Sequence, residues 1–336
     1  IATYRAHGAL ELTLHQFAAA HEVGEAAHAA HPDSPDALAI LVDSSIELGR
    51  YDEAEMHLRA LLDRRPNAAA LARVAYLREI RGDLDGARVA MAQAETAATG
   101  NVAESATIAT LVGDLALAAG EPAEALAAYE RAEAHESGRS LTALGTARAL
   151  AALGRVDDAI SVVDASIARF PEPAVLTMLG ELYERAGRAG DARAVYERTA
   201  ALIDRHGEAG EDNSLEKARF HADHGDVDVA VQSAERAFRI RPTVFAADTL
   251  AWALTRAGRP NDALSYLEQA HRLGTDTVDM HVHAAAAYAG AGMRDRAIDS
   301  LEAAFAHAPY TFPELRPIAA ELAGELGVAV PRAWAD

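Results

Sequence analysis

Alanine stands at the same place in nine successive segments of this chain, and this period constrains the fold more than any other feature of the sequence. The nine positions are Ala20, Ala54, Ala87, Ala125, Ala159, Ala192, Ala230, Ala263 and Ala297, at intervals of 34, 33, 38, 34, 33, 38, 33 and 34 residues. A glycine lies five residues before the alanine in eight of the nine segments. A period near 34 residues is typical of helix–turn–helix repeat arrays, so the sequence predicts nine such units.

Each unit has a common set of positions when the shared alanine is numbered 20. The units then begin at residues 1, 35, 68, 106, 140, 173, 211, 244 and 278. Position 15 is Gly in every unit but the first, which has His15, and a left-handed cap at the end of the first helix favours Gly there. Position 8 is small in eight units, which lets the two helices approach closely. Pro occupies position 32 in five units, where the second helix should end.

One unit carries the fullest version of the pattern. It spans residues 173–206 and contains Leu176, Leu179, Gly180, Tyr183, Gly187, Ala192 and Tyr196, with Pro171 just before it. In these positions the chain resembles the tetratricopeptide repeat family, from residue 1 to about 311. The stretches 71–83 and 247–259 also resemble a group of bacterial tetratricopeptide repeat proteins without an assigned activity. The resemblance implies an all-α, right-handed α-solenoid of about nine repeats that acts as a binding scaffold.

The charge of the chain bears on its partners. The formal net charge is −20, and Lys217 is the only lysine. Phosphate binding needs clustered Lys and Arg, so we expect no nucleic-acid partner. A basic protein or peptide would be attracted by this field.

Features that the sequence lacks exclude some kinds of site and bear on where the protein is located. There is no Cys, which excludes disulfides, thiolate metal sites and Cys nucleophiles. No apolar run has the length of a membrane span. The missing Cys and a first residue that is not Met favour export, and we expect that a leader or a further repeat precedes residue 1.

Two segments break the period, because two intervals are 38 residues long. The extra residues lie around 101–105 and 206–210, where either a helix gains a turn or a loop projects. The segment 203–214 is polar and contains Gly, so it is predicted to be a projecting loop. A tolerated insertion and a functional loop both remain open for it.

The chain after the last unit predicts a capping helix. Pro317 favours a helix start and Gly327 a helix end, while Ile318, Leu322 and Leu326 form one apolar stripe, with Ala319 on another face. The predicted division is a repeat array over 1–311 and a capping helix with a tail over 312–336.

Chemical motifs are scarce. The sequence contains no phosphate-binding GxxxxGK, no HExxH and no GxSxG, so we predict no enzyme, no catalytic residues and no cofactor. His221 and His224, near three Asp residues, are the candidates for a metal site. The alternative is an ordinary helix end that places His beside the negative pole of the helix. His281 and His283 are two residues apart and point to different sides of a helix, so they should not chelate one ion.

The resemblance also implies which side chains line the concave groove, because positions 2, 5, 9, 12 and 13 point into it in the family. Carried onto this chain, these positions include the groove candidates Tyr76, Asp114, Arg148, Glu181, Arg185, Arg219, Asp248, Trp252 and Arg256. Tyr76 and Trp252 would anchor a bound segment, since aromatic residues dominate many interfaces. The alternative for Trp252 is packing between helices.

Three functions remain open at this point. The first is a non-enzymatic scaffold that holds a protein or peptide in the groove. The second is a structural subunit whose copies stack end to end as a homo-oligomer. The third is a metal-binding accessory protein that uses the His and Asp residues of 221–228.

Overall fold

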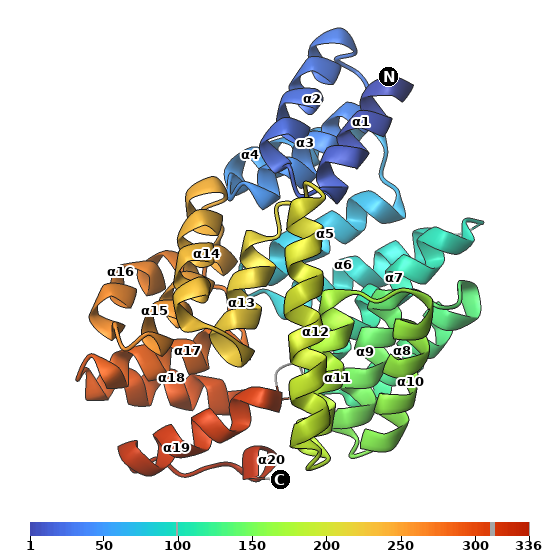
Figure 1. The fold of residues 1–336 in the computed structure, drawn as a ribbon. Coiled ribbons are helices and arrows are strands. Elements are labelled where there is room, and N and C mark those ends of the chain that lie inside the picture. The colour runs from blue at the N-terminus through green and yellow to red at the C-terminus, as the bar shows by residue number, and fades with distance from the viewer. Residues whose placement is uncertain (99, 310–312, 336) are drawn as a thin grey trace.

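The computed structural model describes residues 1–98, 100–309 and 313–335, and these residues form helices without strands (Figure 1). The first helices of nine successive pairs are α1 (Ala2–Thr13), α3 (Pro35–Glu47), α5 (Ala68–Ile80), α7 (Val102–Ala118), α9 (Ser140–Ala152), α11 (Pro173–Arg185), α13 (Ser214–His224), α15 (Val244–Arg256) and α17 (Val278–Gly290). Their partners are α2 (Phe17–Ala30), α4 (Tyr51–Arg64), α6 (Leu84–Ala97), α8 (Pro122–His135), α10 (Val156–Arg169), α12 (Ala189–Glu208), α14 (Val227–Ile240), α16 (Pro260–Ala270) and α18 (Arg294–Ala306). The short helices η1 (Pro313–Leu315), α19 (Arg316–Leu326) and α20 (Arg332–Ala335) follow.

The predicted all-α solenoid fold is confirmed. Seven of the nine first helices begin within one residue of the predicted start of their unit, and the exceptions are α7 and α13. No helix in the described ranges combines the length and the apolar character that crossing a membrane would need.

The turn between the paired helices has the predicted left-handed backbone. Seven of the eight glycines at position 15 have φ between 71° and 78°, and His15 of the first unit takes the same conformation with φ 55°. Gly225 differs, with φ −141°. Its helix α13 is short, and the imidazole of His221 lies where a side chain at 225 would be, accepting a hydrogen bond from the Asp226 N–H at 3.1 Å.

Small residues set the distance between paired helices. The alanine at position 20 is at most 1% exposed in all nine units. At position 8, Gly113 and Gly180 face Tyr129 and Tyr196, whose rings occupy the space that a methyl group would need. The units with Tyr at position 24 are therefore units that have Gly at position 8, because a large side chain on one helix requires a small one on the other.

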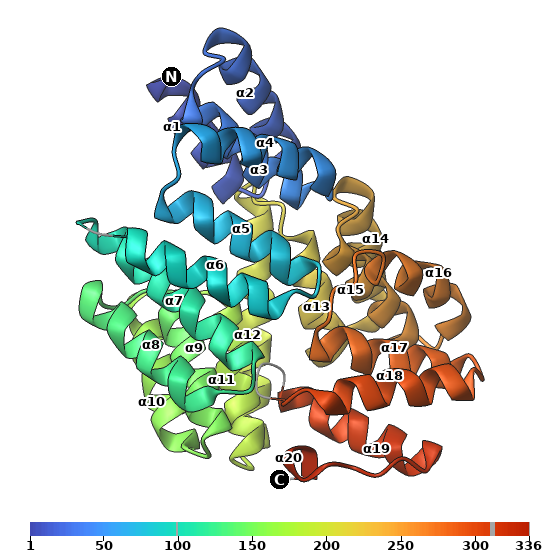
Figure 2. The same cartoon turned by 180° about the vertical axis from the view of Figure 1, so that it is seen from behind.

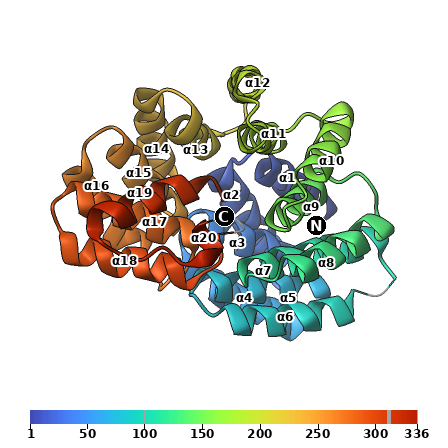
Figure 3. The ribbon, with the colours of Figure 1, turned by 90° about the horizontal axis from the view of Figure 1, so that it is seen from below.

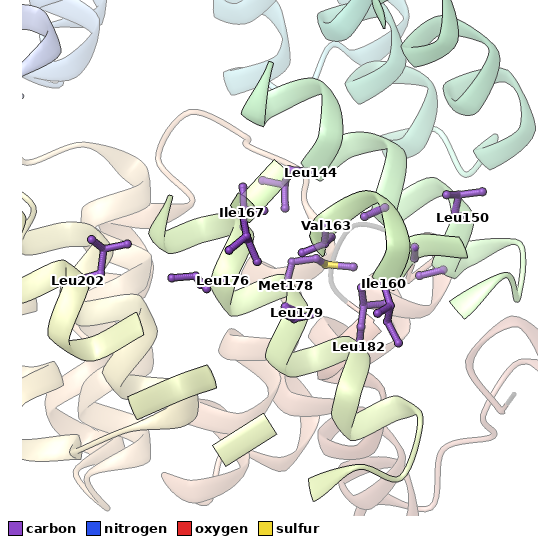
Figure 4. Packing of buried hydrophobic residues seen from close by; sticks show 14 residues of the cluster. Leu144, Leu150, Ile160, Val163, Ile167, Leu176, Met178, Leu179, Leu182 and Leu202 are labelled. Atoms are coloured by element: carbon purple, nitrogen blue, oxygen red, sulfur yellow. The ribbon is translucent and has the colours of Figure 1, made fainter. Parts of the chain in front are cut away.

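Each unit buries its apolar residues against its neighbours rather than in a central core. The cluster shared by the fifth and sixth units contains Leu144, Ile160, Val163, Leu176 and Met178 (Figure 4). Further clusters of this kind follow one another along the chain, as expected for a solenoid in which each repeat packs on the next.

Both segments that break the period lengthen helices. Residues 102–105 add a turn to the start of α7. The prediction of a projecting loop over 203–214 is wrong, because α12 continues to Glu208. One Gly costs a helix only about 1 kcal/mol, and the burial of Leu202 and Ile203 on its inner side offsets this. Only residues 209–213 lie outside a helix, and they turn inward.

The helix pairs wind into a superhelix that completes a turn. Seen from below, α9, α11, α13, α15 and α17 lie on the inside of a ring, and their partners α10, α12, α14, α16 and α18 lie on the outside (Figure 3). Units far apart in the sequence therefore lie side by side: α4 of the second unit is beside α14 of the seventh in both side views (Figures 1 and 2).

We call the line where successive turns of the superhelix meet the seam. There the turn inside each of the first four units contacts the loop that follows a unit five places later. The Asp212 N–H donates to the Leu14 carbonyl at 3.0 Å, and the Val244 N–H donates to the Tyr51 hydroxyl at 3.1 Å. The Thr275 hydroxyl donates to the Ile80 carbonyl at 2.5 Å. The second insertion thus supplies the loop on which the first unit rests.

Buried charge also crosses the seam. The Arg241 side chain is 4% exposed and lies 3.4 Å from both Glu47 of the second unit and Glu216 of the seventh, with its guanidinium over the ring of Phe17. Burial raises the pKa of Glu47, and Arg241 opposes this shift. One cation therefore joins three units.

The helix α19 packs against α17 and α18 at the C-terminal end of the array. It has Pro317 in its first turn and ends before Gly327, whose φ is 71°. Leu322 and Leu326 are buried, and so is Ala319, which corrects the placement of Ala319 on another face. The predicted boundary at 311 and 312 lies outside the described residues. In the tail, Trp334 is 3% exposed, donates to the His307 carbonyl and packs on Phe305.

Two glycines with the same backbone conformation, one at the seam and one away from it, test how tightly the seam is packed. Gly49 and Gly187 have φ 71° and 73°, but a Cβ on Gly49 would lie 2.7 Å from the Pro242 carbonyl oxygen, whereas a Cβ on Gly187 would meet open space. Gly187→Ala should cost ~1–2 kcal/mol of stability from the left-handed backbone alone. Gly49→Ala should cost a further ~1–3 kcal/mol from overpacking.

Thermal and urea unfolding of the two variants measure this difference. Equal losses of stability would contradict a tight seam.

Candidate functional site

A cavity of about 840 Å³ that is partly open to solvent lies on the inner side of the ring. Its walls come from the first helices α9, α11, α13, α15 and α17, which are inner helices of the last five units. Thr13 and His15 of the first unit reach it from one side, and Glu314 and Leu315 of η1 reach it from the other. The volume lies within the ~300–1,000 Å³ typical of ligand sites.

Carboxylates dominate the polar part of this cavity. Eight acidic residues line it: Glu172, Glu181, Glu211, Glu216, Asp223, Asp248, Asp279 and Glu314. Only Arg148 and Arg219 oppose them, together with four His residues. Walls of one sign concentrate the field inside a cleft, so this cavity attracts cations.

Three side chains on α15 and α17 form the most deeply buried polar group of the cavity. His283 Nδ1 lies 2.9 Å from Asp248 Oδ2, and the imidazole stacks on the indole of Trp252 with 4.3 Å between ring centroids. Burial lowers the pKa of His283, but the charges of Asp248, Asp279 and Asp223 outweigh it, so the net shift is upward. The Trp252 N–H donates to Asp223 at 2.8 Å.

Two carboxylate oxygens in this group have no partner among the described residues. Asp248 is 2% exposed and Asp279 is 9% exposed, and the Oδ1 atom of each makes no hydrogen bond. A buried acceptor without a donor is costly, particularly when it is charged. Both residues line the cavity. Their Oδ1 atoms are themselves buried, so a donor bound in the cavity would pair with them once the carboxylates rotate toward it.

A second cluster lies at the junction of α11, α12 and α13. His224 stacks on Tyr196 at 4.2 Å and lies 3.3 Å from Glu181. Burial lowers the pKa of His224, but Glu181 and the acids around it produce a net rise. Burial and the nearby Glu181 raise the pKa of Glu314 well above its usual value. These acids repel one another when all are ionised.

Further acids with raised pKa values lie on α5 and α7, outside the lining of the cavity. Burial, followed by the charge of Asp114, raises the pKa of Glu79 to about 7. Asp114 accepts a hydrogen bond from Tyr129 at 2.7 Å, and burial still raises its pKa. Tyr76 is partly exposed, but loss of solvent around its hydroxyl, followed by the charges of Glu47 and Glu79, raises its pKa.

The structure brings five of the nine predicted groove residues to the cavity, namely Arg148, Glu181, Arg219, Asp248 and Trp252. Trp252 is 3% exposed, so it packs between helices and shows little of its ring to the cavity. Tyr76, Asp114, Arg185 and Arg256 do not line this cavity. Arg256 instead donates to the Ala222 carbonyl and lies over the Trp252 ring.

His221 and His224 take different partners. His221 accepts from the backbone of Asp226, whereas His224 faces Glu181 inside the cavity.

Asp279, His283 and Glu314 are among the cavity residues that sequence reasoning missed. Asp279 occupies position 2 of its unit, so the family rule for inward positions identifies it. His283 stands at position 6, which the rule omits, and it turns inward because Asp248 and Trp252 hold it there. Glu314 comes from beyond the repeats, and no repeat pattern places it in the groove.

A protein-family model matches parts of the chain that form helix pairs in the structure. Residues 11–78 and 116–182 match the family model of the tetratricopeptide repeat. Tetratricopeptide repeats are therefore present in these two segments of the chain. No curated protein matches the sequence.

Several solved structures are similar to this chain. A chain of the APC/C hetero-tetramer Cut9–Hcn1 is 17% identical, with 92% of this chain and 52% of that one covered and a TM-score of 0.45. A tetratricopeptide repeat protein from Parabacteroides merdae is 16% identical, with 76% and 98% covered and a TM-score of 0.41. PilF of Pseudomonas aeruginosa is 18% identical, with 65% and 96% covered and a TM-score of 0.43. This chain spans about half of the Cut9–Hcn1 chain, and likenesses of this size carry no argument about function.

The raised pKa of Glu79 predicts a pH dependence of stability. The folded protein holds this proton up to about pH 7 and the unfolded chain only to about 4.5, so the folded state binds more protons between these values. Stability should therefore fall as the pH rises through this window. Glu79→Gln should remove that part of the loss, raising stability at pH 8 by about 1 kcal/mol with little change at pH 4.

Unfolding of wild type and variant at the two pH values tests this prediction. Glu130→Gln, on the exposed side of α8, is the control. A gain from Glu79→Gln that is the same at both pH values would contradict it.

Proposed function

We propose that this protein binds a cationic segment of a partner protein in its inner cavity. Tetratricopeptide repeats are scaffolds for protein interaction, and the cavity is the part of this scaffold whose chemistry selects a ligand. The observation that carries the proposal is the pair of buried carboxylates, Asp248 and Asp279, each with one oxygen that lacks a donor.

A guanidinium or ammonium group fits this environment for two reasons. It donates several hydrogen bonds and so satisfies carboxylate oxygens that are otherwise unpaired. It also neutralises acids that repel one another, such as Glu181 and Glu314, since burial and then the charge of Glu181 raise the pKa of Glu314. The free energy that these groups cost the free protein is recovered when the cation binds.

The apolar walls favour a peptide over a small inorganic ion. Leu144, Met178 and Phe220 line the cavity together with its acids, and Leu141 lies there with 66% of its surface exposed. An extended peptide would bury such a surface with its backbone and apolar side chains while an Arg or Lys reaches the carboxylates.

Binding of labelled peptides tests the proposal. We expect a peptide of alternating Gly and Arg to bind, and its Gly and Glu counterpart to fail. The double variant Asp248→Asn with Asp279→Asn keeps the shape of both side chains and should weaken binding of the Arg peptide by about 10-fold or more, because hydrogen bonds between charged groups are worth ~1.5–3 kcal/mol each.

A matched control separates the cavity from the general charge of the protein. Glu22→Gln with Glu130→Gln removes two negative charges from exposed positions on the second helices α2 and α8, and it should change the affinity by less than about 2-fold at physiological salt. Equal losses in both double variants, or tighter binding of a small amine than of any peptide, would overturn the peptide assignment. Circular dichroism checks that each variant is folded.

The end-to-end stacking of copies and the metal site at 221–228 stay predictions from the sequence. Light scattering addresses the first, and metal analysis of His221→Ala the second.

A further inference from the structure

A cluster of imidazoles and one carboxylate lies outside the cavity, beside the seam. Asp276 is in the loop between α16 and α17, His281 is in the first turn of α17, and His307 directly follows α18. Within the described ranges, these three residues are the set whose ligand atoms all lie within 4.8 Å of one another. The repeats bring them together from three separate segments.

The geometry of the cluster converges on a single oxygen. Asp276 Oδ1 lies 2.6 Å from His281 Nε2 and 3.0 Å from His307 Nε2. The two imidazole rings are nearly parallel, with an angle of 17° and 5.8 Å between centroids. The side chains of Asp276, His281 and His307 are 49%, 16% and 25% exposed, so an ion has access to them from solvent.

We propose that Asp276, His281 and His307 form a site for a divalent transition metal ion of the zinc class. Two neutral imidazoles and a carboxylate are the ligands that such ions prefer, with a water molecule completing a tetrahedral shell. Each imidazole would bind the ion through Nε2, so its remaining proton would be on Nδ1.

Neighbouring residues support the same arrangement. His271, at the end of α16, stacks on His281 with 5.8 Å between centroids and so helps to fix the orientation of this ligand. The Trp334 N–H donates to the His307 carbonyl at 3.0 Å and fixes the backbone beside this ligand.

The position of the site gives the metal a role. Next to Asp276, Thr275 donates to the Ile80 carbonyl of the third unit, and next to His307, Ala308 lies against Gly120 of the fourth. A bound ion would tie together the two loops on which these units rest. The metal would therefore hold the C-terminal half of the seam together. This effect does not depend on a ligand in the cavity.

Metal binding to the untagged full chain, freed of metal with a chelator, tests the site. We expect one equivalent of Zn²⁺ by calorimetry, and visible absorption of bound Co²⁺ with the intensity of a tetrahedral site. Outer-shell partners of a metal are already worth ~10–100-fold in affinity, so loss of two direct ligands in the double variant His281→Gln with His307→Gln should weaken Zn²⁺ binding by more than about 100-fold. Asp276→Asn is a second variant that removes the charge with the same shape.

The matched control is a second double His→Gln variant at a pair of His residues elsewhere in the chain. His28 and His57 lie 6.5 Å apart between ring centroids in the first two units, far along the chain from the site. The variant His28→Gln with His57→Gln should keep full affinity. Wild type that binds no Zn²⁺ at 100 µM, or unchanged binding in both His281→Gln with His307→Gln and Asp276→Asn, would overturn the site.

The stabilising effect of the metal on the seam is measured separately from metal affinity. Saturating Zn²⁺ should raise the thermal midpoint of wild type by about 2 °C or more and leave the ligand double variant unchanged. It should also slow hydrogen exchange at residues 80–82 and 274–276 on the two sides of the seam. Stoichiometric binding without protection of these segments would overturn this role of the metal.

Discussion

The close approach of paired helices at alanine is the constraint on which the rest of this structure depends. The alanine at position 20 is buried in all nine units, so a larger side chain there would push each pair apart. The pairs set the angle between units, and because the angle is repeated, it sets the curvature of the superhelix. A small change in one pair would thus move distant parts of the molecule.

The curvature brings each of the first four units into contact with the loop that follows the unit five places later in the chain. At this seam the backbone of Gly49 meets that of Pro242, and Arg241 is buried between acids of two units. Solenoids usually have contacts only between neighbours, so stability spreads along them from unit to unit. Here the seam links early and late units, and we expect unfolding to be more cooperative than in an open array.

The same closure encloses the cavity. Inner helices of five units, the turn inside the first unit and η1 surround a space that a less curved array would open further to solvent. Enclosure reduces the solvation of the acids, which raises the pKa of Glu314 and leaves Asp248 and Asp279 with unpaired oxygens. The ligand chemistry that we propose is therefore a consequence of the superhelical turn as much as of the residues themselves.

The sequence by itself determined the repeat. Position 15 predicted the left-handed turns, position 20 the buried contacts and position 2 would have identified Asp279, because each depends on neighbours within about 35 residues. The tertiary structure decided what no local pattern encodes. It continued α12 through a segment that looks like a loop, since burial of Leu202 and Ile203 outweighs one Gly, and it turned Trp252 into a packed residue. It also placed Asp276, His281 and His307 together within one helix pair and the loop before it. The contacts of early units with late ones at the seam depend on the angle summed over many units.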